Sequence, residues 1–468
     1  MKGSKVLGTE PMGKLLFKQS LPAAIGFMVM SLNSVVDTIY LGKFIGEDAI
    51  GAVTAVTAII FLFAVLGMAV GMGGASIVSR ALGAGDKEKA SWALNNQVSL
   101  LLICFVIIVC LGYAFSGDLV WIFGAKGDIF PLGHSYFKVV LLGIPFLAWG
   151  MMCNNNIRAE GRATMAMMIL LVPSVVNIIL DDLLIRQLHG GIESAAWATT
   201  ISFMLSSAFT FYFYFFGKSE LKLKWSQMKL KKKLVAEIAA LGSVSLIRQG
   251  SISLLMIILG WSLHKYGSQD IPFENGGEIA YSSYGVASRL AMFVFFPLIG
   301  ISQGFMPITG YNYGAKQYDR VRKAIKLSVV YGTLIAAVLC SILLAGATYI
   351  PSLFFVGPEM SSYAADAIFY VFMATPLVMF PFIGSSYYQA IGKPLPAMLL
   401  TLTKQTFCLV PIIFLLPVFY GLDGIWFSFP IADTLAAMIC LYYLLKATRR
   451  LKPVEPKFPP PLPKPPSV

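Results

Sequence analysis

The chain contains two similar stretches, Ile157-Arg158-Ala159-Glu160-Gly161-Arg162-Ala163-Thr164-Met165-Ala166-Met167 and, 231 positions later, Tyr388-Gln389-Ala390-Ile391-Gly392-Lys393-Pro394-Leu395-Pro396-Ala397-Met398. The copies share an Ala, a Gly, a basic residue and an Ala-Met pair. Other pairs recur at a similar spacing, such as Gly83-Ala84 with Gly314-Ala315 and Gly191-Ile192-Glu193 with Gly421-Leu422-Asp423. The chain is therefore expected to consist of two related halves.

The composition places these halves in a lipid bilayer. Of the 468 residues, 57% are hydrophobic and only 13% are charged. Apolar runs of about 20 residues recur between short polar loops, and this is the length that a helix needs to cross the hydrocarbon core. Residues 100–115, 195–216 and 328–350 are examples. The sequence therefore predicts an all-α polytopic membrane protein, because a helix satisfies its own backbone hydrogen bonds in lipid.

Twelve spans are predicted, six in each half. Their approximate limits are 15–41, 49–76, 93–116, 133–156, 164–186, 194–217, 236–264, 281–308, 326–348, 363–390, 398–418 and 423–446. This division predicts four domains: an N-terminal lobe (1–217), a basic linker (218–235), a C-terminal lobe (236–446) and a basic, Pro-rich tail (447–468). Because each half has an even number of spans, the pseudo-symmetric lobes should be related by an axis along the membrane normal, with cargo binding between them.

The net charge of +13 does not indicate nucleic-acid binding, because most of the 36 Lys and Arg residues fall in alternate loops and in both terminal segments. An excess of Lys and Arg is typical of cytoplasmic loops, and it also favours contact with anionic lipid. The basic segment 218–233 lies on that side as well. Both termini are therefore expected in the cytoplasm.

Two predicted spans repeat the same polar pair. Asn33 precedes Asp37 by four residues in the first span, and Asn177 precedes Asp181 by four residues in the fifth. Residues four apart share a helical face. Ionisable side chains inside a span are unfavourable in lipid and are therefore candidates for function. Asp37 could instead simply reach water at the outer end of its span.

If these two faces converge, their oxygen atoms could bind a small cation, with a hydroxyl from Thr199 or Thr200. Na⁺ and H⁺ both suit such a site, because two neighbouring carboxylates repel each other and can trade a proton for a metal ion or a cationic substrate. No resident cofactor is expected.

The second half carries a different set of charged candidates: Arg248, Gln249, Arg289, Lys404 and Asp433. Lys404 and Asp433 could form a buried ion pair between neighbouring helices. The sequence has neither a Walker motif nor a nucleophile with an adjacent base, and its three histidines have no metal-binding spacing. An ATP-driven pump and an enzyme are both disfavoured.

Four stretches together resemble the prokaryotic branch of the multidrug and toxic compound extrusion (MATE) transporters. They are Val36-Asp37-Thr38-Ile39-Tyr40-Leu41-Gly42, Ser79-Arg80-Ala81-Leu82-Gly83-Ala84-Gly85-Asp86, Arg158-Ala159-Glu160-Gly161 and Asn177-Ile178-Ile179-Leu180-Asp181. They occur in order at the expected spans, and the resemblance covers nearly the whole chain. It implies two six-helix lobes in the cytoplasmic (inner) membrane of a prokaryote, which export organic cations and amphipathic toxins by antiport with Na⁺ or H⁺.

The resemblance also implies functional residues. In one subgroup of the family a first-lobe acidic site corresponds to Asp37, Asn177, Asp181 and Thr199, which would be the Na⁺ ligands, and Tyr136 resembles an aromatic residue of the same pocket. A subgroup with a second-lobe acidic site is less similar, because Arg248 and Gln249 stand where carboxylates would be sought.

One position departs from the family pattern. The fifth-span Asp is usually followed by Pro, but this chain has Asp182 there. Asp182 is either a third carboxylate of the site or, since it points about 100° away from Asp181 on a helix, a residue that faces extracellular water.

Two alternative functions remain open. A flippase for lipid-linked precursors could share the two-lobe architecture and would use Arg248, Arg289 and Lys404 to bind pyrophosphate. A non-transporting membrane receptor or scaffold would act through its linker or tail. The expected partners are small organic cations or amphipathic drugs and membrane lipids, the protein is expected to be a monomer, and nucleic acid is not a partner.

Overall fold

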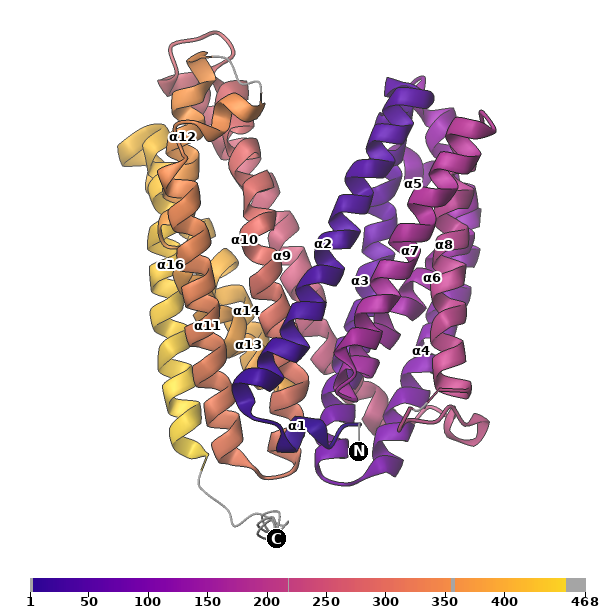
Figure 1. The fold of residues 1–468 in the computed structure, drawn as a ribbon. Helices are drawn as coiled ribbons and strands as arrows, with labels where there is room; N and C mark the ends of the chain where they lie inside the picture. Colours follow the sequence, from indigo (N-terminus) through magenta and orange to yellow (C-terminus); the bar gives the residue numbers. More distant parts are fainter. Residues whose placement is uncertain (1–2, 218, 355–357, 452–468) are drawn as a thin grey trace, which may run out of the picture.

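The structure is a computed structural model that describes residues 3–217, 219–354 and 358–451 (Figure 1). These residues form helices and connecting turns, with no strand among them. The predicted all-α fold class is confirmed. Lys218, at the start of the predicted linker, and most of the predicted Pro-rich tail lie outside the described residues.

The N-terminal lobe follows a short helix, α1 (Val6–Thr9). Its helices are α2 (Met12–Phe44), α3 (Glu47–Gly83), α4 (Lys87–Ala114), α5 (Ser116–Ile122), α6 (Ile129–Ala159), α7 (Ala163–Asp181) with its continuation η1 (Asp182–Gln187), and α8 (Ile192–Phe215). The linker contains one short helical turn, η2 (Trp225–Gln227), and it ends where α9 begins at Lys232.

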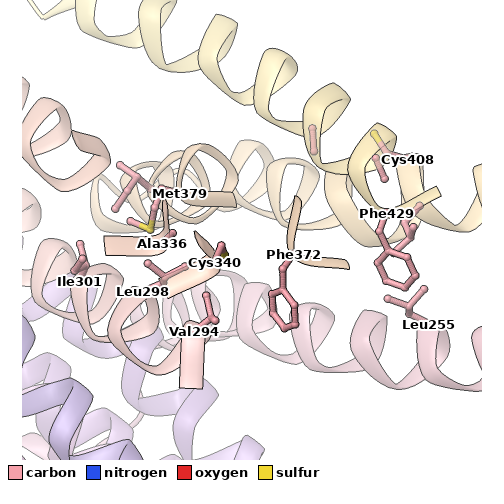
Figure 2. Close-up of a cluster of buried hydrophobic side chains, with 14 of the residues drawn as sticks. Leu255, Val294, Leu298, Ile301, Ala336, Cys340, Phe372, Met379, Cys408 and Phe429 are labelled. Atoms are coloured by element: carbon pink, nitrogen blue, oxygen red, sulfur yellow. The ribbon is translucent and has the colours of Figure 1, made fainter. Parts of the chain in front are cut away.

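The C-terminal lobe contains the remaining helices. They are α9 (Lys232–Asp270), α10 (Gly276–Gly314), α11 (Tyr318–Ala345), η3 (Ile350–Phe354), α12 (Pro358–Met373), η4 (Thr375–Val378), α13 (Met379–Ala390), α14 (Pro394–Leu402), η5 (Thr403–Leu409), α15 (Val410–Leu415) and α16 (Pro417–Arg450). Buried aliphatic, aromatic and sulfur-containing side chains such as Leu298, Cys340, Phe372 and Phe429 pack together inside this lobe (Figure 2).

The number of spans depends on how bent and polar helices are counted. Among the described residues, ten helices are long and apolar enough to cross a membrane, and an eleventh span results if Met360–Met373 and Thr375–Ala390, bent by 40°, are joined. Helix α8 has 24 residues and is therefore about 36 Å long, enough for a bilayer core. It is rich in Ser, Thr and aromatic residues, which makes it less hydropathic. Including α8 gives the predicted twelve.

The sequence repeat corresponds to equivalent backbone turns. Gly161 follows α6 with φ of 78°, and Gly392 follows α13 with φ of 80°. This left-handed conformation ends a helix and favours glycine, because a side chain would meet the backbone. Gly85, after α3, has φ of 82°, and the position 231 residues later is Lys316, with φ of 59°. The two halves therefore end corresponding helices with the same geometry.

The lobes meet at the end of the molecule where α1 lies and α16 finishes, and they diverge toward the other end (Figure 1). Helix α2 packs on α10, while α3 packs on both α9 and α10. Glycines permit these close crossings: a Cβ on Gly83 would meet the Tyr311 carbonyl, and one on Gly314 would meet that of Arg80. Polar bonds join the lobes at the same end, from Ser76 Oγ to the Gln389 carbonyl (2.6 Å) and from Arg80 to Glu237 (2.8 Å).

One buried carboxylate lies in the loop after α6, at this closed end. The Glu160 carboxylate accepts hydrogen bonds from Ser219 Oγ (2.7 Å) and from the Glu220 backbone N–H (2.8 Å). Burial raises the pKa of Glu160 to about 7, although these two hydrogen bonds and the Arg162 charge act in the opposite direction. Glu160 thus joins the linker to the first lobe, although burial disfavours the ionised form of its carboxylate.

The stability of the protein is expected to depend on pH through Glu160. Its folded-state pKa exceeds the ordinary value of 4.5, so the folded protein holds this proton more tightly, and stability falls as pH rises from about 4.5 to 7. The shift corresponds to at most about 3 kcal/mol. Thermal unfolding in detergent across this range tests the prediction. The Glu160→Gln variant should lose this part of the pH dependence, and an unchanged slope in that variant would contradict the assignment.

Candidate functional site

A cavity of about 230 Å³ lies inside the N-terminal lobe, between α2, α3, α6, α7 and α8. Its walls combine aromatic and sulfur-containing side chains with small polar ones. The lining residues are Met30, Asn33, Ser34, Asp37, Thr57, Ile60, Phe61, Ala64, Tyr136, Phe146, Leu147, Gly150, Met151, Ile169, Leu170, Pro173, Ser174, Asn177, Thr199, Ser202, Phe203 and Ser206.

The structure brings together the two polar pairs of α2 and α7. Asn33 Nδ2 donates to Asn177 Oδ1 (2.9 Å), and Asn177 Nδ2 lies 3.5 Å from Asp181 Oδ1. The Asp37 carboxyl is within hydrogen-bonding reach of Asp181. Asp181 is fully buried behind the cavity wall, whereas Asp37 is partly exposed and lines the cavity. The two carboxyl groups therefore face each other at one end of the cavity.

Several oxygen atoms of this cluster are buried without a hydrogen-bond donor among the described residues: Asp37 Oδ1, Asp181 Oδ2 and Asn33 Oδ1. A buried carboxylate oxygen without a donor is unfavourable, and two such groups in contact also repel each other. A shared proton would satisfy them, and so would a hard cation such as Na⁺, which binds oxygen ligands. The donor set fits both predicted ions.

Of the predicted hydroxyl and aromatic residues, Tyr136 and Thr199 line the cavity and Thr200 does not. Tyr136 is buried and lines the cavity, where its hydroxyl lies within hydrogen-bonding reach of Thr199, a half-buried residue of the same wall. Thr200, one position later on α8, instead donates to the Val139 carbonyl on α6 (3.2 Å) and is not among the lining residues. Of the two threonines, Thr199 is the one placed to contact a bound ion or substrate.

Asp182 is not among the residues that line the cavity and is a clasp between helix ends. Its carboxylate accepts hydrogen bonds from the Tyr40 hydroxyl of α2 (2.9 Å), from Gln187 (2.9 Å) and from the Arg186 guanidinium, at 2.8 Å to each oxygen. These contacts fix η1, which has π-helical geometry. Asp182 thus ties α7 to α2 one residue beyond Asp181.

Removing this clasp should weaken the lobe without removing the acidic pair. We expect Asp182→Ala to lower the midpoint temperature of thermal unfolding, because hydrogen bonds to a charged acceptor are lost. Tyr40→Phe, which deletes only the α2 contact, should have a smaller effect of the same sign. Thermal unfolding in detergent measures both.

The exposed pair of Asp319 with Arg322 (3.2 Å) provides a matched control. Asp319→Ala should change stability by less than about 0.5 kcal/mol, because solvent screens the pair. Equal effects of Asp182→Ala and Asp319→Ala would show that Asp182 is not a clasp.

The second-lobe candidates do not form one site. Lys404 and Asp433 form the suggested ion pair (2.7 Å) between η5 and α16, and Lys404 also lies 5.6 Å from the Phe295 ring centre. Arg248 of α9 donates to Ser385 Oγ on α13 (3.2 Å). The adjacent Gln249 is half-buried, and Arg289 of α10 is exposed. In the part of the chain that the structure describes, Arg248 has no acidic partner within ion-pair distance.

Sequence reasoning missed most of the small polar residues of the cavity wall. On α8, Thr199, Ser202, Phe203 and Ser206 line the cavity together. Their spacing of three, four and seven residues is that of one helical face. Met30, Asn33, Ser34 and Asp37 have the same spacing on α2. This periodicity was a usable signal, because small polar residues concentrated on one face of an apolar span indicate a face turned away from lipid.

Comparisons with known proteins agree with this architecture. The MatE family model matches residues 22–183 and 274–415, which lie in the two lobes. The multidrug export protein MepA of Staphylococcus haemolyticus is 26% identical over 438 residues, covering 94% of each chain. The FAD transporter of Shewanella oneidensis is 24% identical, covering 97% of this chain and 98% of the relative.

Solved structures have the same fold. An outward-facing conformation of a multidrug resistance MATE family transporter of the MOP superfamily matches with a TM-score of 0.87 at 24% identity, over 96% of this chain and 99% of the other. A MOP superfamily transporter from Pyrococcus furiosus, whose reverse-polarity binding pocket suggests a different function, also matches with a TM-score of 0.87 at 24% identity. The match covers 97% of this chain and 99% of the other. Since the family model covers more than half of the chain and spans both lobes, the protein belongs to the MATE family of membrane transporters.

Proposed function

We propose that this protein is a secondary active efflux transporter, which exports organic cations and amphipathic toxic compounds by antiport with Na⁺ or H⁺. The observation that supports this best is the facing pair Asp37 and Asp181, each with one buried oxygen that has no donor among the described residues, beside a cavity with aromatic and methionine walls. The MepA relatives, which are multidrug export proteins, support the same substrate class.

The acidic pair provides the coupling. A proton or Na⁺ that enters from outside reduces the negative charge of the Asp37–Asp181 pair by one unit and so weakens the attraction of a cationic drug to the same cavity. Ion and drug therefore compete, and the ion favours release of the drug. Coupling also requires that the affinities for the ion and for the drug differ between the outward-open and the inward-open conformations of the transporter.

The cavity walls suit flat hydrophobic cations. Phe61, Tyr136 and Phe203 provide aromatic surfaces, and cations bind favourably over such rings. The flexible side chains of Met30 and Met151 can adapt to different shapes. At about 230 Å³ the cavity is smaller than the roughly 300–1,000 Å³ usual for drug-sized ligands. A bulky drug must therefore displace these methionines or extend toward the second lobe.

Transport in proteoliposomes tests the proposal. Efflux of ethidium should occur under an imposed Na⁺ gradient or an imposed pH gradient, and the gradient that drives it identifies the coupling ion. Liposomes without protein are the control for leakage. Absence of efflux under either gradient, in protein that remains folded, would contradict the export of organic cations by antiport.

A phosphate-bearing cargo is the second candidate function. Arg248 has Ser385 as a hydrogen-bond partner and no acidic partner within ion-pair distance among the described residues, and one relative is a FAD transporter. A lipid-linked precursor would require the same anion recognition, but Lys404 is already paired with Asp433 and Arg289 lies on an exposed surface. Loading the same liposomes with FAD or with a lipid-linked pyrophosphate distinguishes these cargoes from ethidium.

We also propose an orientation of the protein in the membrane. With both termini in the cytoplasm of a prokaryote, the end where the lobes meet is cytoplasmic, and the end where they diverge faces outward (Figure 1). Each protomer contains a complete acidic pair, and a monomer therefore suffices for transport.

A further inference from the structure

A second cavity, of about 380 Å³, lies on the other side of the N-terminal lobe, between α4, α6, α8 and the linker. Its walls are almost entirely hydrocarbon and aromatic. They are formed by Val98, Leu102, Phe105, Pro145, Phe146, Trp149, Phe211, Phe215, Leu223, Trp225 and Met228. The indole N–H of Trp149 is already used in a bond to Thr210 Oγ1 (2.7 Å). The groove therefore offers a ligand apolar contact and little else.

The linker that closes one end of this groove is held firmly on α4. The Asn95 side chain accepts a hydrogen bond from the Lys224 backbone N–H (2.9 Å) and donates to the Lys222 carbonyl (3.0 Å). Asn96 accepts one from the Lys231 N–H (2.8 Å), and Ser99 Oγ donates to the Met228 carbonyl (2.7 Å). Both asparagines are fully buried. The linker is thus a fixed wall rather than a loose connection between lobes.

The linker has two chemically different faces. Leu223, Trp225 and Met228 line the groove. Lys222, Lys224 and Lys229 alternate with them and are exposed. None of these three lysines takes part in an ion pair within the described ranges. Trp225 is 86% exposed although it is one of the largest apolar side chains. An aromatic residue flanked by lysines at the end of an apolar groove is typical of the membrane interface, at the level of the lipid headgroups.

We propose that this groove binds one anionic phospholipid, with an acyl chain along the apolar walls and the phosphate at Lys222, Lys224 and Lys229. Charge complementarity selects this occupant. No carboxylate is among the described residues that line the groove, so nothing there attracts a cationic drug, and a lipid without net charge would leave the three lysines without a partner. Phe146 lines both this groove and the acidic cavity, so the bound lipid supports a wall that the two cavities share. The proposal does not depend on what the protein transports.

The test measures lipid binding directly. Purified full-length protein is incubated with equal amounts of phosphatidylglycerol and phosphatidylcholine of identical chains and examined by native mass spectrometry. We expect one phosphatidylglycerol to be retained in preference. Neutralising three lysines in Lys222→Gln/Lys224→Gln/Lys229→Gln should reduce that preference on the order of 100-fold, because each lysine near an anionic headgroup contributes a factor of roughly five. The groove-filling variant Leu102→Trp should lose the bound lipid.

Two control variants match these changes. Lys265→Gln neutralises an exposed lysine in the C-terminal part of α9, and Leu334→Trp enlarges an exposed residue of α11 away from the groove. Both should retain phosphatidylglycerol as the unaltered protein does. Phe146 is left unchanged because it also lines the acidic cavity.

Three outcomes would overturn the proposal. Equal retention of the two lipids by the unaltered protein would remove the role of the lysines. Undiminished phosphatidylglycerol binding in Leu102→Trp would place the lipid elsewhere. Displacement of the lipid by ethidium, with ethidium binding abolished by Leu102→Trp but not by Asp37→Asn, would make the groove a drug site. Because binding rather than transport is measured, failure of the export proposal would leave this result unaffected.

Discussion

Replacing Asp37 with Asn is expected to abolish gradient-driven efflux of ethidium from proteoliposomes, and Asp181→Asn should do the same. Asn has almost the same shape as Asp, so packing around α2 and α7 should persist. The amide, however, can neither take up a proton nor neutralise a cation. Losing one partner of a buried charged contact removes about 2–5 kcal/mol, which corresponds to a decrease of at least about 30-fold in ion affinity.

The double variant shows whether the two residues form one site. If Asp37 and Asp181 bind the same ion, Asp37→Asn/Asp181→Asn should lower the ion affinity, measured by direct binding, no further than either single variant does, because groups that act as a unit are not additive. Asp182→Asn is the matched control, since this carboxylate does not line the cavity and contacts Tyr40 and Arg186. Efflux that survives both single substitutions would place the coupling site in the second lobe, around Asp433.

The second large effect is expected at the crossing of α3 and α10. In Gly83→Ala the new methyl group would meet the Tyr311 carbonyl, and in Gly314→Ala it would meet the Arg80 carbonyl. Both obstacles are backbone atoms, which cannot move aside as a flexible side chain can. Overpacking of this kind disfavours a conformation by about 1–3 kcal/mol. We therefore expect the population with the lobes separated at this end to rise by roughly 5- to 150-fold.

Cysteine labelling measures this shift. Ser76 is fully buried at the junction, where it bonds the Gln389 carbonyl, and a Ser76→Cys probe in a background without native cysteines should react with a maleimide only when the lobes separate. Labelling should accelerate in both glycine variants. Gly250→Ala is the control, because its Cβ would meet no atom within 4 Å. Unchanged labelling in Gly83→Ala would show that the crossing tolerates the methyl group.

Much of the architecture could be predicted because its causes are local. The length and hydropathy of each apolar run indicate a spanning helix whatever its neighbours are, and the repeated Gly161 and Gly392 have positive φ values that depend on the turn itself. Helix α8 shows the limit of this reasoning. The Ser and Thr residues that reduce its hydropathy, such as Thr199 and Ser202, are those that line the cavity.

The candidate site was predicted in part. The Asn-to-Asp spacing placed Asn33 with Asp37 and Asn177 with Asp181, because four residues are about one helical turn. That spacing could not show that the two turns face each other, since α2 and α7 are separated by four other helices in the chain. Nor could it place Asp182, whose partners Tyr40 and Arg186 come from two different elements.

By itself, then, the sequence determined the all-helical membrane class, the division into two related lobes and the residues that carry charge into the bilayer. The first and the third follow from the properties of single segments, and the second follows from comparing residues 157–167 with residues 388–398. Only the tertiary structure decided that Asp37 lies within hydrogen-bonding reach of Asp181, that Asp182 is a clasp, that Lys404 is paired with Asp433, and that the linker forms a wall of an apolar groove. These features depend on how helices rotate and cross, and helix crossings are set by packing between segments that are distant in the chain.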